Sequence, residues 1–214
     1  MSTFPGSPRL FKGAIVSLDP TTKRPLSTIA FQYNPETLTR TLGIRQAPQE
    51  NSSRTEALRL GGAPTESITL NIVLDATDRL EKAEPTALAL GVYPQLSALE
   101  LLIYPKSSKV AFNMAKAKSG IKEIVPLEAP ITLLVWGVQR VLPVRVTSFT
   151  ITEEAYDVAL NPIRAKVALS FQVLTYNDLP WNSLGSRLFF AHQVKKEQIG
   201  RKIGAAVSGI NLFG

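Results

Sequence analysis

Cysteine is absent from this chain of 214 residues. The protein can therefore have no disulfide framework, no thiolate zinc site and no cysteine nucleophile. Long apolar runs are missing as well. The longest spans residues 131–138, far short of the ~20 residues needed to cross a bilayer. The first residues, MSTFPGSPRLFKG, lack the apolar centre of a secretory signal, so we expect a cytoplasmic protein without a leader or membrane segment.

Histidine is nearly absent too, since His192 is the single one. A site of three histidines is excluded, and we expect His192 to be an exposed residue of a helix. Glu153 and Glu154 are adjacent in a predicted strand, so their side chains would point to opposite faces and form no carboxylate pair. With no combination of nucleophile, base and oxyanion donor, we expect no enzyme, no metal site and no cofactor.

Positive charge is in excess, with a formal net charge of +7. Residues 181–214 contain five basic side chains and one acidic one, so they contribute +4. Such a tail can bind nucleic acid, or it can simply be the solvated end of a helix. Arg164 and Lys166 share the exposed face of a predicted strand, but no aromatic residue lies in that row, as nucleic-acid readers require. We expect no nucleic-acid partner and keep a basic nucleic-acid-binding β-barrel as the alternative from another class.

Two alternating runs, residues 150–156 and 163–173, are joined by a polar turn that contains Asn161 and Pro162. Successive side chains of a strand point to opposite faces, so this period predicts a long β-hairpin with one buried face. The rest of the chain would build a sheet or barrel on it. The residues of the buried face in the second run are Ile163, Ala165, Val167, Leu169, Phe171 and Val173.

Further strands are predicted at residues 10–18, 27–33, 36–44, 66–75, 131–138 and 142–151, about eight in all. The run at 131–138 is apolar on both faces, which predicts an interior strand. One internal helix is expected at residues 94–103, where Pro94 occupies the favoured first position. The predicted fold class is mainly β, a β-barrel or two-sheet domain with one flanking helix.

Two polar stretches, residues 46–63 and 106–123, predict long loops with little reason to be ordered in a single copy. A second helix is expected at residues 183–198, before a tail punctuated by glycines. We therefore divide the chain into a β domain, residues 1–180, and a C-terminal helix and tail, residues 181–214. The row of this helix that we expect to carry its apolar side chains consists of Leu184, Leu188, Ala191 and Lys195.

Four segments in this order resemble a known family. They are FQYNPETL at residues 31–38, ESITLNIVLDATDRLE at 66–81, GVYPQLSALELLIYP at 91–105, and the hairpin from ITE at 151–153 to NPIRA at 161–165. Together they resemble the tube-like domain of contractile injection systems, which are phage-tail-like particles. The chain is similar to the tube initiator, or baseplate hub adaptor, that in relatives also carries a LysM module. No LysM-like sequence follows Trp181, which puts in doubt a role in clamping the hub to the wedges.

The resemblance implies a tube-protein-like fold and a structural protein that forms a homo-oligomeric ring, a homohexamer. The ring would join the spike hub to the inner tube and initiate tube assembly, with the spike hub, inner tube protein and baseplate wedge proteins as partners and no small-molecule substrate. Assembly would take place in the bacterial cytoplasm. An ordinary inner tube subunit of the same particle is the alternative within this family.

The resemblance also suggests which residues make contacts in the particle. Arg164 and Lys166 would face the lumen or a ring neighbour, and at least one of the two long loops would become ordered on that neighbour. The C-terminal segment would be a docking arm, although the same helix could instead pack on its own barrel. The apolar anchors expected in the arm are Leu188, Phe189, Phe190, Ile210, Leu212 and Phe213.

Overall fold

The computed structural model describes residues 11–19, 22–46, 59–119 and 130–206. The central part of the predicted loop at residues 46–63 and the expected anchors Ile210, Leu212 and Phe213 lie outside the described residues. Within the described part, no helix is both long enough and apolar enough to cross a membrane.

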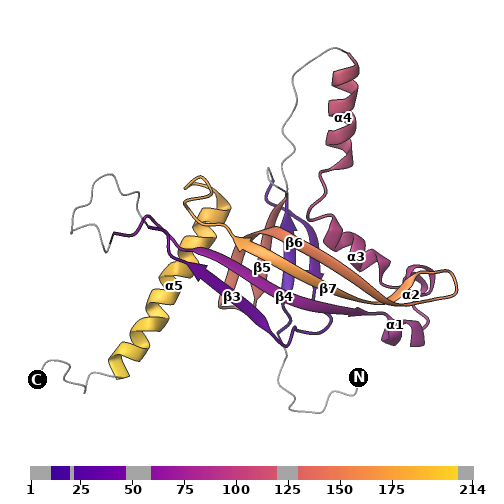
Figure 1. Ribbon diagram of the computed structural model, residues 1–214, viewed down its shortest axis with the longest axis horizontal. Coiled ribbons are helices and arrows are strands. Elements are labelled where there is room, and N and C mark those ends of the chain that lie inside the picture. Colours follow the sequence, from indigo (N-terminus) through magenta and orange to yellow (C-terminus); the bar gives the residue numbers. More distant parts are fainter. Residues whose placement is uncertain (1–10, 20–21, 47–58, 120–129, 207–214) are drawn as a thin grey trace, which may run out of the picture.

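The described chain folds around one antiparallel sheet of seven strands, in the order β2-β1-β5-β6-β7-β4-β3 (Figure 1). The mainly β fold class is thereby confirmed. Seven strands occur rather than eight because the runs predicted at 142–151 and 150–156 are one continuous, bent strand. The strands are β1 (Ala14–Leu18), β2 (Pro25–Ala30), β3 (Leu38–Gly43), β4 (Thr65–Asp75), β5 (Ile131–Trp136), β6 (Arg140–Tyr156) and β7 (Pro162–Val173).

The hairpin of β6 and β7 is confirmed and forms the centre of the sheet. Along β7, side chains alternate between buried and accessible positions, and those at 165, 167, 169, 171 and 173 are buried as predicted. β4 continues the same buried face, because its register places Ile68 beside Phe171 and Ile72 beside Val167. Each fully buried aliphatic or aromatic side chain of this kind stabilises the fold by about 2 kcal/mol.

One core collects buried side chains from both ends of the sheet. Ile15 of β1 and Leu134 of β5 belong to the same cluster as Leu70 of β4. A flat sheet would keep these strands apart, so the sheet must curve around its core, as a twisted sheet does. Phe31 closes the cluster beside Trp136, with ring centroids 6.3 Å apart.

Three short helices, α1 (Thr77–Glu81), α2 (Pro85–Leu90) and α3 (Tyr93–Glu100), follow β4. The predicted internal helix corresponds to α3, which buries Leu96 and Leu99 in the core. Gly91 joins α2 to α3 with φ +57°, and a Cβ there would meet the Pro162 carbonyl oxygen at 2.1 Å. Only glycine lets the backbone at residue 91 come this close to the Pro162 carbonyl. The close contact allows the Val92 N–H to donate to the same carbonyl at 2.8 Å.

The prediction of a loop at residues 106–123 is wrong for most of this stretch, because residues Ser107–Lys118 form the helix α4. Its alanines, lysines and methionine are strong helix formers. No residue of α4 is buried, so the apolar periodicity that identifies most helices is missing here. Figure 1 shows α4 projecting away from the sheet. The expectation of one flanking helix is therefore corrected to four helices among the described residues between β4 and β5.

The last helix, α5 (Leu184–Ala206), confirms the predicted C-terminal helix and extends it. It packs across β6, and its C-terminal end reaches past the sheet (Figure 1). The row of α5 that faces the domain differs from the predicted one. Gly185, Ser186 and Phe189 are buried, whereas Leu184 and Leu188 are half-buried and Ala191 is exposed. The contact surface is shifted by one residue because Gly185 allows a close approach to Leu179 and Pro143.

Candidate assembly surfaces

The FQYNPETL segment ties two distant parts of the sheet together. It runs from the end of β2 to the start of β3, which are the two edge strands. Asn34 accepts a hydrogen bond from the Gly13 N–H and donates to the Phe11 carbonyl, both at 2.9 Å. Gln32 accepts from the Asp75 N–H, also at 2.9 Å. These side chains connect the start of β1 and the end of β4, so the motif has a structural role.

The structure places Arg164 and Lys166 on the exposed face of β7. Glu154 lies between them: its carboxylate is 3.3 Å from Arg164 Nε and 2.5 Å from Lys166 Nζ. Asp75 is within 3.9 Å of Arg164, and its pKa is lowered chiefly by a hydrogen bond from the Thr77 hydroxyl. Glu154 can reach the lysine because the register of β6 against β7 shifts between Glu153 and Ala155.

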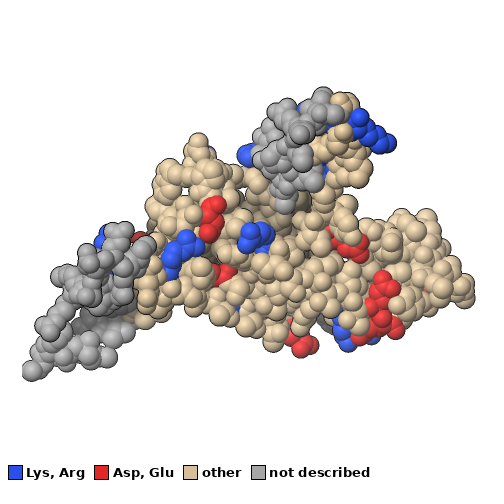
Figure 2. Space-filling view, turned by 45° about the horizontal axis from the view of Figure 1, so that its top comes forward, with Lys and Arg blue, Asp and Glu red and all other residues tan. Residues whose placement is uncertain are grey.

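A shallow hollow of about 830 Å³ lies over this exposed face of the sheet. It connects the FQYNPETL segment to the charged row, since its lining includes Asn34, Thr37, Arg164 and Lys166. The rest of the exposed face carries mostly small side chains from three strands, with Thr69 beside Ser170 and Thr150 beside Ala168. Arg145 adds a charge there and donates to the Gln172 side chain at 2.7 Å. Figure 2 shows charged side chains of both signs scattered in small groups over the face in view.

A cluster of charges centred on one buried carboxylate lies beneath α5. Glu66 of β4 is only 2% exposed, and its carboxylate is 2.6 Å from Arg40 Nε and 3.7 Å from Lys196 Nζ. Arg140 also acts on this cluster: burial lowers its pKa, as does the charge of Arg40, while the charge of Glu66 opposes the shift. A buried carboxylate requires such partners, because an unpaired charge in the interior is very costly. Glu66 therefore holds β3, β4 and α5 together.

His192 lies beside this cluster and is half-buried, so the expectation of an exposed helical histidine is wrong. Both ring nitrogens are shielded from solvent and lack a hydrogen bond of normal geometry to the described residues. Burial lowers the pKa of His192, and the charge of Lys196 lowers it further. In the described part of the chain, no three residues among His, Cys, Asp and Glu are grouped as metal ligands.

The expected anchors of the C-terminal arm that fall among the described residues occupy three different environments. Phe189 is 5% exposed and belongs to the core of its own domain. Leu188 is half-buried. Phe190 is 42% exposed, and its ring packs edge-on against the exposed Trp181 with centroids 5.4 Å apart. Of these three, Phe190 presents the most surface to a partner.

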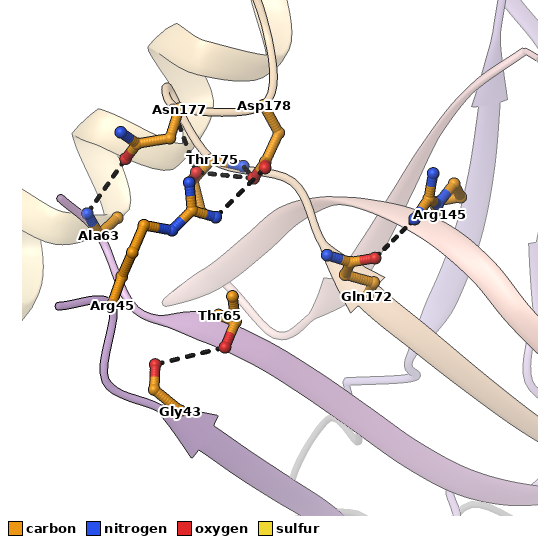
Figure 3. A network of polar contacts seen from close by, with 9 residues as sticks. All are labelled: Gly43, Arg45, Ala63, Thr65, Arg145, Gln172, Thr175, Asn177 and Asp178. Atoms are coloured by element: carbon orange, nitrogen blue, oxygen red, sulfur yellow. Dashed lines mark hydrogen bonds and ion pairs between the residues drawn. The ribbon is translucent and has the colours of Figure 1, made fainter. Parts of the chain in front are cut away.

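A polar network between the end of β7 and the start of α5 sets the direction of the helix (Figure 3). Asp178 accepts hydrogen bonds from the N–H and hydroxyl of Thr175, at 3.0 and 2.7 Å, and is 3.3 Å from Arg45 Nη2. Asn177 accepts from the Ala63 N–H at 3.1 Å. Burial raises the pKa of Asp178, but the hydrogen bonds from Thr175 and the Arg45 charge outweigh it, so the pKa is lowered.

Two features of these surfaces escaped the sequence reasoning. Glu66 occupies an inward position, two residues before Ile68 on the buried face of β4, and this register could have revealed a buried acid. Its partner Lys196 is 130 positions further along the chain, and no local pattern relates the two.

Comparison with known proteins identifies the family. The family model "contractile injection system tube protein" matches residues 10–179, most of the chain. The chain belongs to this family. It is a structural tube protein, as the resemblance implied, and the matched segment ends five residues before α5 begins at Leu184. No curated protein matches the chain.

Among solved structures, one similar chain comes from the tail of an empty GTA particle with C6 symmetry. It is 15% identical, with 75% of this chain and 90% of that chain covered, and the TM-score is 0.31. This likeness is too weak to support an argument about fold or function.

Proposed function

We propose that this tube protein is the tube initiator of its contractile injection system. Six copies would form a ring that joins the spike hub to the inner tube and starts tube assembly. The observation that carries the proposal is α5. This helix of 23 residues lies wholly outside the segment that matches the family, yet it is built into the domain through Phe189 and Lys196. An adaptor needs contacts to a second kind of neighbour, and α5 supplies a surface for them.

The edges of the sheet support a ring of identical copies. The sheet ends in β2 on one side and β3 on the other, where Leu26 is 47% and Leu42 is 50% exposed. Edge strands with apolar side chains readily pair with another chain. Head-to-tail contacts between two different edges close into a ring when the rotation between copies allows it.

In such a ring the exposed face of β7 would line the lumen. Beyond the charged pair this row continues as Ala168, Ser170 and Gln172, which need no apolar partner, and the charges of Arg164 and Lys166 are offset by Glu154. A lumen of this kind is hydrated and close to neutral along the charged row. The spike hub, the inner tube protein and the baseplate wedges would contact the two rims, with α5 on one of them.

The second candidate is an ordinary inner tube subunit of the same particle. The observation that favours it is the family match itself, whose description is a tube protein. Electron microscopy of the purified full-length chain, alone and with the inner tube protein, separates the two. We expect single closed rings that elongate only when the tube protein is added. Long tubes formed by this chain alone would assign it to the tube instead.

A basic nucleic-acid-binding β-barrel stays the alternative from a different class, on account of the net charge of +7. Binding to a DNA duplex would then fall steeply as salt is raised. Monomers that bind DNA in this way, and never form rings, would overturn the proposed function.

A further inference from the structure

The turn between β6 and β7 is held rigidly by its own polar groups. The Asp157 carboxylate accepts hydrogen bonds from the Ala159 N–H, the Asn161 N–H and the Asn161 side-chain amide, each at 2.8 Å. The Asp157 N–H donates in turn to the Asn161 carbonyl at 2.9 Å. Asp157 and Asn161 thus form a base that leaves the three residues between them facing solvent. We call residues 157–161 the hairpin tip.

The side chains displayed by the hairpin tip are apolar. Val158 is fully exposed and Leu160 is 78% exposed. Leu160 also has φ +64°, a left-handed conformation that bulky residues rarely adopt and that glycine would adopt without strain. A strained, exposed leucine on a rigid base gains nothing within its own domain. Backbone strain of this kind is typically found at functional sites, where the strained residue contacts a ligand or a partner.

Helix α4 has the complementary properties. None of its residues is buried. Even its large apolar side chains Phe112 and Met114 are 54% and 64% exposed. It carries Lys109, Lys116 and Lys118 and no acidic residue. The end of the hairpin, residues 152–163, has the opposite character, with three acids and no basic residue. Glu154 among them is paired with Arg164 and Lys166. Asp157 accepts hydrogen bonds within the turn and Glu153 accepts one from the Tyr156 hydroxyl, contacts that leave both negative charges at the end of the hairpin.

We propose that the hairpin tip of one copy docks on α4 of a second copy. Val158 and Leu160 would pack on the exposed apolar side chains of α4, while its lysines face Glu153 and Asp157. Figure 1 shows α4 and the turn between β6 and β7 leaving the body at well separated places, so the contact joins two molecules. Because it uses two different surfaces, it is head-to-tail and propagates around a ring or between rings. This inference rests on the proposed assembly and names one of its contacts.

The absence of cysteine permits a direct test. Two full-length single-cysteine chains, Val158→Cys and Met114→Cys, are mixed, assembled and oxidised gently. A disulfide-linked dimer that needs both chains is expected, and it should disappear in a matched mixture of Val158→Cys with Leu42→Cys, where the second cysteine lies on the edge strand β3 and is 50% exposed. Rings that assemble from the Val158→Cys and Met114→Cys chains without this cross-link would overturn the docking while leaving the ring intact.

The backbone strain at Leu160 allows a second test, in which one substitution should preserve or raise stability and weaken self-association. Leu160→Gly relieves the left-handed backbone and removes the apolar side chain, so the Tm should rise or stay unchanged while self-association weakens at least about tenfold. Ala83→Gly is the matched control, since Ala83 is also exposed, at φ +50°. It should affect the Tm in the same direction and leave association unchanged.

The remaining outcomes are also decisive. A clear fall of the Tm in Leu160→Gly would mean that Leu160 stabilises its own domain, and unchanged association would mean that nothing docks there; either overturns the inference. Lys109→Glu with Lys116→Glu should weaken association, and adding Glu153→Lys should restore part of it. If the wild-type chain forms no rings under any of these conditions, the proposed function itself fails, and the docking contact fails with it.

Discussion

His192 illustrates how the surroundings of one residue set its chemistry. The ring is carried by α5 itself, its nitrogens are shielded from solvent, and the charges of Lys196, Arg140 and Glu66 act on it. Burial and the neighbouring cations disfavour the charged imidazolium, and they outweigh the opposing effects of the Gln139 backbone and the Glu66 charge. The unfolded chain has no such preference. Folding therefore favours neutral His192.

This preference makes stability depend on pH. Because the pKa of His192 is lower in the folded chain than the ordinary histidine value of about 6.5, the unfolded state binds the proton first as the pH falls. We expect the free energy of unfolding to decrease progressively below about pH 6.5. Urea denaturation at pH 7.5, 6.5, 5.5 and 5.0 measures it.

His192→Leu is the matched variant, and it should remove this pH dependence because the chain has no other histidine. Parallel loss of stability in the wild type and in His192→Leu between pH 7 and pH 5 would show that other groups are responsible.

At the scale of one element, α5 combines two functions on opposite sides. Its inner row enters the core through Phe189, whose ring also packs edge-on against Tyr176 at 5.7 Å. Its outer row presents Phe190 beside Trp181. The first residues of the helix are therefore packed into the same core as the sheet.

Substitutions at these neighbouring phenylalanines should separate folding from docking. Phe189→Ala should lower the free energy of unfolding by about 3–4 kcal/mol, because a buried ring is lost and a cavity remains. Phe190→Ala should cost only about 1 kcal/mol, since its main packing is one edge-on contact with Trp181. Urea denaturation measures both. Equal losses would mean that the two rings are equally buried in solution.

Considered together, the described residues form a curved sheet from which the hairpin tip, α4 and the C-terminal end of α5 project. Beyond Lys196, which reaches Glu66, the exposed apolar residues of α5 are Ile199 and Ile203, 46% and 70% exposed. The end of the helix past this point contributes little to the core. It is the part of the described chain best placed to contact another protein of the particle.

Truncation after Gln198 should therefore leave a folded chain that still forms rings. The Tm should change by less than about 3 °C, because the side chains described at residues 199–203 are all exposed and exposed positions contribute little to stability. Binding to the spike hub or wedge proteins, measured by co-purification, should be lost if the end of α5 is the docking arm.

A full-length variant with Ile199→Glu and Ile203→Glu is the control that keeps the helix. It should lose binding as the truncation does. Normal co-purification of both proteins would rule out docking through this end.

Local side-chain patterns were sufficient for the strands. The alternation along residues 163–173 predicted which side chains of β7 are buried, because the period of two is a property of an extended backbone wherever it lies. The same reasoning failed for α4. A helix without a buried face leaves no apolar period, and only its composition indicated it.

The sequence by itself determined the β-rich core, the hairpin, the C-terminal helix and the family, because each follows from residues that are neighbours along the chain. Only the tertiary structure decided that Phe189 rather than Leu188 enters the core, that Glu66 meets Lys196, and that Leu160 is strained and exposed. These depend on how distant segments approach one another. A one-residue shift of α5 changes every partner of its inner row while leaving its helical pattern unaltered.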